Sequence, residues 1–541
     1  MATTILLSAF VISLVALAFF IVAMIKGWFD PDARGAEVIF AHGEIGRTED
    51  PAASVASRRA LQAQSGRAGN APDASELASR ALADRSTATV TFIFLCCAVV
   101  WLVSASLAGL TASLELHAPD WLASYEWLTF GRIRTLHLNA VAYGWTPMAG
   151  LGVAIWLLPR LLKTPLVGAN FAIIGALLWN AGLIAGLGAI AVGFSDGMEW
   201  LEMPWQVDLL LVAGGALIAI PLVLTIRARQ VEHIYVSIWY MGAALFWFPV
   251  LFLVGNVPGV HFGVQQAATN WWFGHNVLGL FYTPIALGTI YYFLPKVLGT
   301  PVRSYALSML GFWTLAFFYG QVGAHHLIGG PVPGWLVTLS IVQSMMMIVP
   351  VLAFTVNMYL TMQGRMRALL HSPTLLFVAF AGLAYMASSL QGSFEALRSV
   401  NTVTHFTHYT VGHAHLGMYG FIAMAIFGGI YFIMPRVMER EWPYPRLILA
   451  HFWLAAVGIA IYFGALTIGG WLQGSAMLDA ARPFMESVTV TLPYLKARSV
   501  GGLLMTLGHV AFAAHFVAMV LKLGPSRSAA PVFGDMEARH A

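Results

Sequence analysis

The sequence is poor in charged residues and almost free of cysteine. Only 10% of its 541 residues are Asp, Glu, Lys or Arg, whereas 59% are hydrophobic. Long uncharged apolar runs recur along the chain, a pattern typical of a polytopic α-helical membrane protein. The formal net charge of +4 is small and lies mostly in loops, so the charge pattern does not suggest a nucleic-acid partner.

The two cysteines, Cys96 and Cys97, are adjacent and lie inside an apolar run. Neighbouring cysteines cannot form a Cys-x-x-Cys metal site, nor the Cys-x-x-Cys-His motif that attaches haem c. The chain also has no glycine-rich nucleotide loop and no evident internal repeat. We therefore interpret the cysteines as inert buried thiols, and the unusual feature that remains is a set of 17 histidines.

The apolar runs predict an all-α membrane protein with twelve main spans and one extra N-terminal span over residues 4–25. The main spans are expected near 91–113, 133–159, 168–193, 207–226, 235–255, 270–295, 304–326, 336–361, 374–393, 409–434, 446–469 and 499–522. Lys and Arg are concentrated in alternate loops, whereas loops 194–206, 256–269 and 327–335 have none. The positive-inside rule therefore predicts a cytoplasmic C-terminus.

Four parts follow from this pattern. Residues 1–50 form a membrane anchor, and 51–90 form a flexible cytoplasmic linker that is rich in small and charged residues without helical periodicity. Residues 91–522 form the twelve-helix domain, and 523–541 form a cytoplasmic tail. The first span is not preceded by a basic stretch, so we interpret it as a true span and not as a signal peptide.

Six histidines are expected at one depth, near the outer face of the membrane. Each lies at the outer end of a predicted span: His137, His275, His325, His326, His413 and His415. His413 and His415 point about 200° apart on a helix, so they either hold one ligand on each flank or pack as hydrogen-bonded side chains. Six imidazoles at one level suit a bis-histidine haem, a five-coordinate haem and a three-histidine copper.

These histidines make the chain resemble the catalytic subunit I of the haem-copper oxidase superfamily, and most closely the cbb3-type (C-type) cytochrome c oxidases. The similarity covers residues 91–522 and implies a twelve-helix haem-copper oxidase bundle. It implies that low-spin haem b is held by His137 and His415, high-spin haem b3 by His413, and copper (CuB) by His275, His325 and His326.

Tyr319 stands six residues before His325. In cbb3-type oxidases a tyrosine at this place is covalently linked to the copper ligand that corresponds to His275. The resemblance implies that Tyr319 and His275 are catalytic, and that Tyr319 supplies a proton and an electron for O–O cleavage. A tyrosine that only fills the core is the alternative. Nitric oxide reductases lack this tyrosine and carry glutamates near their metal, whereas no Glu surrounds His275, so the pattern favours an oxidase.

Three hydroxyl side chains lie deeper on two of the same helices. Ser308 precedes Tyr319 by eleven residues and lies about 17 Å deeper, while Thr283 and Tyr291 lie about 12 and 24 Å below His275. They match the single K-type proton channel of cbb3-type oxidases, which would end at Tyr319. Hydroxyl groups that only bond to their own helix backbone are the alternative.

Haem propionates need cations, and two arginines match the propionate partners of the family. Arg134 lies one turn before the first of the six histidines, and Arg498 lies at the start of the last span. Arginines that merely reach the membrane surface are the alternative. Glu202, in a loop without Lys or Arg, resembles an acidic residue that helps bind a calcium ion between the propionates.

Residues 1–50 resemble the small single-span maturation protein of cbb3-type oxidases, through the stretches 27–30 and 35–40. The resemblance implies that this module is fused to the catalytic subunit. An additional membrane anchor without that role is the alternative.

The sequence thus predicts a terminal respiratory oxidase subunit that reduces O2 to water, receives electrons from cytochrome c through low-spin haem b, and translocates protons. The expected partners are membrane lipid, monohaem and dihaem cytochrome c subunits, and a soluble or membrane-bound cytochrome c donor. The expected location is the bacterial cytoplasmic (inner) membrane, with the metal centre near the periplasmic side. The alternatives are a nitric oxide reductase of the same superfamily and a cofactor-free membrane transporter or assembly scaffold.

Overall fold

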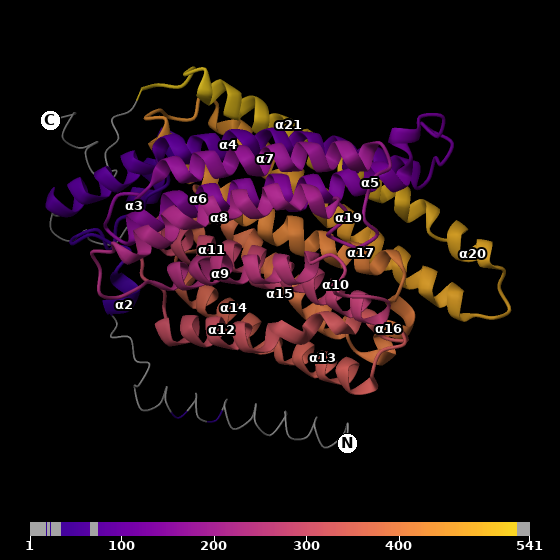
Figure 1. Cartoon of the computed structure of the whole chain (residues 1–541). Coiled ribbons are helices and arrows are strands. Elements are labelled where there is room, and N and C mark those ends of the chain that lie inside the picture. The colour runs from indigo at the N-terminus through magenta and orange to yellow at the C-terminus, as the bar shows by residue number, and fades with distance from the viewer. Residues whose placement is uncertain (1–17, 19–21, 23–33, 65–73, 527–541) are drawn as a thin grey trace.

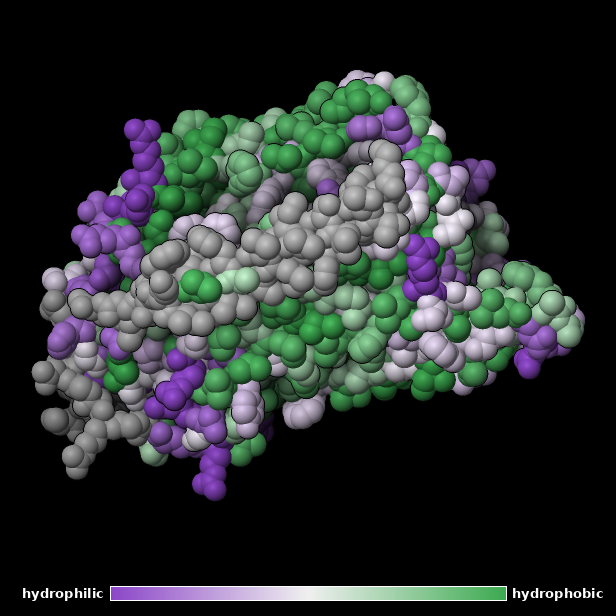
Figure 2. Space-filling view, turned by 90° about the horizontal axis from the view of Figure 1, so that it is seen from below, coloured by the Kyte–Doolittle hydropathy of each residue, from purple (hydrophilic) through white to green (hydrophobic). Residues whose placement is uncertain are grey.

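The computed structural model is a bundle of long helices that run side by side (Figure 1). It describes residues 18, 22, 34–64 and 74–526, and within this part the only β-structure is two isolated bridges. Eleven helices in the described part are long and apolar enough to cross a membrane. Apolar side chains cover the flank of the bundle, and hydrophilic ones gather mainly towards its ends (Figure 2). The predicted all-α membrane fold is confirmed.

Three helical stretches form the centre of the bundle and carry the sites described below. Their most apolar segments are 83–94% buried, against 33–50% for the other eight spans. The three central stretches are α5–η2–α6 (Phe130–Asn139, Ala140–Trp145, Thr146–Leu161), α10–η3–α11 (Val264–Val277, Leu278–Tyr282, Thr283–Leu298) and α17–η6–α18 (His408–His415, Leu416–Ala423, Met424–Val437). These three stretches therefore lie inside the bundle, and the other helices surround them.

The remaining elements surround this centre or connect the spans. The outer helices are α4 (Ala74–Glu115), α7 (Ala169–Ala191), α8 (Trp205–Arg227), α9 (Val236–Asn256), α12 (Tyr305–Phe318), α13 (Gly334–Met346), α14 (Ile348–Met362), α15 (Pro373–Glu395), α19 (Pro445–Leu478) and α21 (Leu492–Val520); α13 and α14 together form one span. The short elements are α2 (Arg34–Glu37), α3 (Val55–Ala63), η1 (Glu126–Leu128), η4 (Tyr319–Leu327), η5 (Met366–Leu370), α16 (Arg398–Thr404) and α20 (Phe484–Thr489).

The three central stretches share a repeated local pattern, although no repeat is evident from the sequence alone. In each, a π-helical segment (η2, η3 or η6) follows within three residues of a histidine that the sequence singled out. Each also ends in a proline followed by a cation: Pro159-Arg160, Pro295-Lys296 and Pro435-Arg436. π-Helical segments are frequent at functional sites. The repeat escapes a sequence comparison because only these few positions recur.

The seventh predicted span, 304–326, is not one regular helix. The α-helix α12 ends at Phe318, and the chain continues as the 3-10 helix η4 from Tyr319. A 3-10 helix rises about 2.0 Å per residue, more than an α-helix, and aligns residues three apart. Tyr319, His325 and His326 therefore lie on the 3-10 segment and not on the α-helix that the predicted span implies.

The predicted flexible linker, 51–90, is largely helical in the structure. It contains α3 and the first turns of α4, and Ala52 and Ala53 are buried. The charged residues that suggested a solvated linker instead pair with other helices; Asp84, for example, lies 2.5 Å from Arg160. A linker is predicted from the local sequence, which does not reveal partners this far along the chain.

The predicted N-terminal span, 4–25, lies almost wholly outside the described residues, as does most of the tail 523–541. At the left of Figure 1, α2 and α3 lie at the bundle end opposite α10, α16 and α17. The two ends thus differ in content: the N-terminal segment covers one, and the histidines lie near the other.

Candidate metal centre

Three histidines meet at one end of the bundle, and we call them the three-histidine cluster: His275 at the end of α10, and His325 and His326 in η4. Their candidate ligand atoms all lie within 4.8 Å of one another. The ring centroid of His275 lies 4.9 Å from that of His325 and 5.3 Å from that of His326. In the described part of the chain, no other group of His, Cys, Asp or Glu reaches three members at such spacing. Three imidazoles suit copper and other metals that prefer nitrogen ligands.

Neighbouring side chains orient these rings. Ser344 Oγ lies 2.9 Å from His325 Nδ1, and the Trp271 ring stacks on His326 at 4.1 Å between centroids. His275 Nδ1 is buried, and no hydrogen-bond partner for it occurs among the described residues. A buried polar atom without a partner is costly, so its free lone pair fits a metal ligand. Sequence reasoning missed Ser344 and Trp271, because a serine or tryptophan in an apolar helix carries no distinctive signal.

Tyr319 packs against the three-histidine cluster. Its ring centroid lies 5.1 Å from that of His275. Asn276 Nδ2 donates a hydrogen bond of 3.0 Å to the carbonyl of Gly320, which ties η4 to α10. Gly279, one turn after His275, leaves room for the ring: a Cβ there would lie 1.7 Å from Tyr319 Cζ. The requirement for glycine follows from this close approach, which the sequence alone does not show.

A cavity of about 290 Å³ lies between the three-histidine cluster and His413 of α17. Tyr319, Thr283 and Tyr385 also line it. His413 packs closely on α15, where a Cβ on Gly392 would lie 2.7 Å from its Cε1. The buried His413 Nδ1 likewise has no hydrogen-bond partner in the described part. The cavity therefore lies between His413 and the three-histidine cluster, and His405 also lines it.

His137 and His415 form a facing pair on the other flank of α17. Their rings are nearly parallel, 8° apart, with centroids separated by 6.4 Å. Their Nδ1 atoms lie 2.8 Å from the carbonyl oxygens of Ala105 and Val411, respectively. These bonds leave both Nε2 atoms as the candidate ligand atoms. His413 and His415 thus serve two different sites from one helix.

The two predicted arginines lie in different surroundings. Arg498 is buried, and its Nε donates to the Tyr462 hydroxyl at 2.8 Å; that hydroxyl lies 3.1 Å from His415 Nε2. Arg134 pairs with Glu199 at 3.0 Å in a half-exposed position. Such an exposed pair is worth only about 0–1 kcal/mol, so Arg134 remains able to bind another anion. Tyr462, missed in the sequence, links Arg498 to the facing pair.

Glu202 is buried in the loop between α7 and α8, and its carboxylate accepts a 2.9 Å hydrogen bond from Asn139 Nδ2. Burial raises the pKa of Glu202 to about 7; the Asn139 bond opposes this shift and the nearby Glu199 adds to it. Asn139 lies two residues after His137, so the carboxylate is close to the facing pair. A calcium role for Glu202 stays a prediction.

The predicted hydroxyl path lies below the cavity. Asn357 Nδ2 donates to Ser308 Oγ at 3.0 Å, and the Tyr291 hydroxyl faces both side chains. Ser308 Oγ also donates to a backbone carbonyl of its own helix at 3.2 Å. The buried Tyr385 hydroxyl, which lines the cavity, has no hydrogen-bond partner among the described side chains. Sequence reasoning missed Asn357 and Tyr385, although an asparagine in an apolar helix is a recognisable signal.

The arrangement matches a known family. The family model described as cytochrome c and quinol oxidase polypeptide I matches residues 89–504. The chain belongs to this family. It is therefore the subunit I of a haem-copper oxidase, and the predicted family and enzyme class, a cbb3-type cytochrome c oxidase, are confirmed.

Curated relatives and a solved structure agree with this membership. The cbb3-type cytochrome c oxidase subunit CcoN1 of Stutzerimonas stutzeri is 31% identical over 77% of this chain and 91% of its own length. A cytochrome c oxidase subunit 1 of Rhodobacter capsulatus is 33% identical over 73% of this chain and 78% of its own. A heme-copper terminal oxidase dimer solved by cryo-EM superposes with a TM-score of 0.66 at 16% identity, covering 82% of this chain and 84% of its own. At that identity it shows the shared fold alone.

Haem and copper, which the family implies, fit the residues present. If one metal ion bound both imidazoles of the facing pair through metal–nitrogen bonds of about 2 Å, the two ring centroids would lie roughly 6 Å apart. The observed separation is 6.4 Å. The cavity lies between His413 and the three-histidine cluster, so its wall offers a candidate haem ligand and three candidate copper ligands. The partnerless His275 Nδ1 supports the copper site independently. The residues of this chain are thus suited to hold both kinds of group.

Proposed function

We propose that this subunit reduces O2 to water at a haem b3–CuB centre, using electrons that arrive from cytochrome c through a low-spin haem b, with coupled proton translocation. His137 and His415 would hold the low-spin haem, and His413 the high-spin haem. The three-histidine cluster would hold the copper. The bound metals supply the redox chemistry; the chain supplies ligation, a low dielectric and proton access.

The observation that carries this proposal is the contact between Tyr319 and His275. Reducing O2 to two water molecules requires four electrons and four protons. Tyr319 places a phenolic O–H at the wall of the cavity, beside the proposed copper ligands, where it can donate a proton and an electron locally. A nitric oxide reductase would have no need of a tyrosine held so tightly that only glycine fits at position 279.

Protons are proposed to reach Tyr319 along hydroxyl and amide side chains. Ser308, Asn357 and Tyr291 lie together below the cavity, and Tyr385 lines it nearby. Hydroxyl groups both donate and accept, so they can relay protons through water where a carboxylate would be costly to bury. Thr283 contributes a further hydroxyl at the cavity wall.

The route of electrons into the site requires partner proteins. This sequence has no Cys-x-x-Cys-His motif, so separate monohaem and dihaem cytochrome c subunits are proposed to deliver electrons from a cytochrome c donor. His137 and His415 would together hold the low-spin haem b, which would supply electron transfer, whereas His413 would hold the haem at which O2 is reduced. Arg498 and Arg134 are proposed to bind the propionates of the low-spin haem, and Glu202 a calcium ion.

The proposed location is the bacterial inner membrane, with the metal centre near the periplasmic side. Three loops on the side of the three-histidine cluster, 194–206, 256–269 and 327–335, lack Lys and Arg, whereas the cations Arg160, Lys296 and Arg436 end the central stretches at the other side. The positive-inside rule assigns that second side to the cytoplasm.

A Tyr319→Phe variant of the complete oxidase complex tests the proposed reaction. We expect it to retain both haems and the copper and to lose O2 consumption, because phenylalanine fills the same space without the O–H group. Full O2 turnover in the variant would contradict the role of Tyr319. NO consumption without O2 consumption by the unaltered enzyme would favour a reductase instead.

A further inference from the structure

Three buried cations end the three central stretches, each directly after a proline: Arg160, Lys296 and Arg436. Their side chains are only 2%, 1% and 5% exposed. Each lies 21–23 residues after a proposed metal ligand on the same stretch, which corresponds to about 32–35 Å at 1.5 Å per residue. An unpaired cation at such a depth would be very costly, so each needs a counter-ion.

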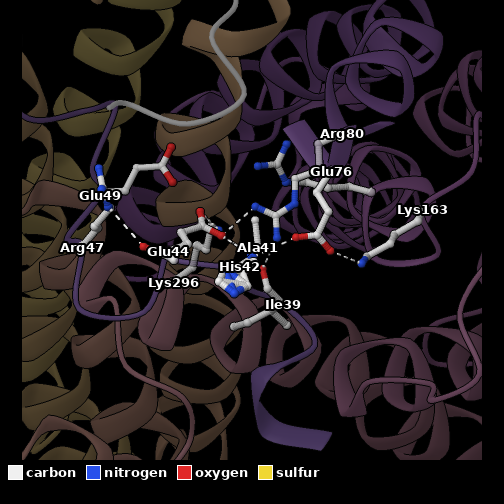
Figure 3. Close-up of polar contacts among 12 residues, drawn as sticks. Ile39, Ala41, His42, Glu44, Arg47, Glu49, Glu76, Arg80, Lys163 and Lys296 are labelled. Carbon is white, nitrogen blue, oxygen red and sulfur yellow. Dashed lines mark hydrogen bonds and ion pairs between the residues drawn. The ribbon is translucent and has the colours of Figure 1, made fainter. Parts of the chain in front are cut away.

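Each of the three cations has a counter-ion in the part of the chain before the family match at residue 89. Asp84 of α4 pairs with Arg160 at 2.5 Å, Glu44 pairs with Lys296, and Glu49 pairs with Arg436. Glu44 and Glu49 belong to one short segment, residues 39–53, which we call the clamp (Figure 3). Nothing in the family comparison assigns this segment a role.

Glu44 is buried and faces two cations. Its carboxylate also lies 2.7 Å from Arg80 of α4, and Arg80 donates a further 2.9 Å hydrogen bond to the Ile39 carbonyl. Burial alone would raise the pKa of Glu44, but the charges of Lys296 and Arg80 outweigh it and hold the pKa well below the usual carboxyl range. The Glu44 carboxylate thus lies between a cation of α4 and a cation of α11.

Backbone contacts seat the clamp on the end of α11. The Gly46 N–H donates to the Gly299 carbonyl at 2.8 Å, and the Glu49 N–H donates to the Val297 carbonyl at 3.1 Å. Gly299 is left-handed, with φ of 63°, and a Cβ there would lie 2.2 Å from the Arg47 carbonyl oxygen. These contacts satisfy carbonyls that the helix end would otherwise leave unpaired.

Asp50 extends the clamp to a fourth helix. Its buried carboxylate accepts hydrogen bonds from Ser372 Oγ at 2.5 Å, from Thr374 Oγ1 at 2.8 Å and from the Thr374 N–H at 3.1 Å, all at the start of α15. The α15 helix in turn packs on His413 through Gly392. The clamp therefore touches α4, α11, α15 and α18.

We propose that the clamp fixes the stretches α10–η3–α11 and α17–η6–α18 relative to one another, with Glu44 and Glu49 as positioning residues for the metal centre at the opposite end. This inference rests on the proposed ligand assignment. Buried ion pairs add little net stability but specify one arrangement when both partners are held, and removing one partner leaves an uncompensated charge. Because helices are stiff, a shift or rotation at the cation end is carried to the histidines.

The two positioning residues act on different stretches, so their effects should differ. Lys296 shares its stretch with His275, and Arg436 shares its stretch with His413 and His415. Glu44→Gln should speed the loss of copper to a chelator at least about tenfold, in line with the loss seen when supporting residues of a metal site are removed. Glu49→Gln should instead alter the optical and EPR signals of both haems. Glu37→Gln, on the exposed side of α2, is the matched control and should change neither.

A rescue experiment separates counter-ion loss from general damage. Glu49→Gln combined with Arg436→Met removes the pair without leaving a buried charge, so haem spectra should return to those of the unaltered complex. If Glu49→Gln alone does not accumulate, recovery of the folded protein in the double variant is the expected result, and no recovery contradicts the inference.

Two further outcomes would contradict the proposed positioning role of the clamp. If both single variants keep normal haem and copper signals and only melt at lower temperature, the clamp merely stabilises the fold. If both variants lose haem and copper to the same extent, the separate coupling to two stretches is wrong. An unaltered complex without haem or copper would instead refute the proposed function itself, so the two failures are distinguishable.

Discussion

Replacing Gly279 with alanine tests whether the position of the Tyr319 ring beside His275 is required for O2 consumption. The added Cβ would lie 1.7, 1.8 and 2.3 Å from three atoms of the Tyr319 ring, where ordinary contact begins at 3.4 Å. The ring must therefore retreat by about 1.7 Å. Its neighbour His275 cannot follow, because it is held among the proposed copper ligands.

The expected cost in rate follows from that displacement. A misplacement of about 1 Å in a catalytic group can cost about 100-fold in rate, or about 2.7 kcal/mol of transition-state stabilisation. We therefore expect Gly279→Ala to lower O2 consumption at least about 100-fold. Overpacking costs about 1–3 kcal/mol of stability, which a bundle of this size can absorb, so the variant should still fold.

The assay is O2 consumption by the purified complex, with haem and copper contents measured on the same sample. Gly464→Ala is the matched control, because a Cβ at this helical glycine would meet nothing within 4 Å. Adding Tyr319→Phe to Gly279→Ala should cause no further loss, since both changes remove one interaction. Near-normal O2 consumption in Gly279→Ala would refute the argument that Tyr319 must contact His275.

Three further predictions concern the metal sites and the clamp. Ser344→Ala should weaken copper binding about 10–100-fold while leaving both haems in place, because it removes the group that orients His325; unchanged copper retention in a chelator titration would count against it. His137→Ala should abolish the low-spin haem signal and keep the high-spin one in EPR spectra, and loss of both would show that the sites are not separate. Glu44 has a lowered folded pKa, so its contribution to stability is complete above the ordinary carboxyl pKa of about 4.3 and is lost as the pH falls through the folded value. The difference in melting temperature between the unaltered enzyme and the Glu44→Gln variant should therefore be largest near neutral pH and become smaller in acid.

The sequence identifies the proposed ligands well because histidine is rare inside apolar helices. A polar residue inside a membrane span is conspicuous, and six histidines at the same depth are consistent with few kinds of site. The supporting residues are different. Gly279, Ser344 and Tyr462 are ordinary residues for a helix, and only their neighbours in space give them a role.

The N-terminal segment shows a second limit of sequence reasoning. The charged residues of 51–90 resemble those of a solvated linker, yet Arg58 pairs with Glu441, 383 residues away. Local patterns predict which residues could be helical, but they do not reveal which distant charge will neutralise which. The seventh span fails for a related reason, since the change to a 3-10 helix at Tyr319 accompanies packing against α10 and is not set by local propensity.

The most direct test of the central claim is a combined measurement on the purified complex: haem and metal content per subunit, with O2 and NO consumption on the same preparation. We predict two haems and one copper in this chain, and O2 consumption driven by reduced cytochrome c. A non-haem iron in place of copper, with NO consumption and no O2 consumption, would contradict the account.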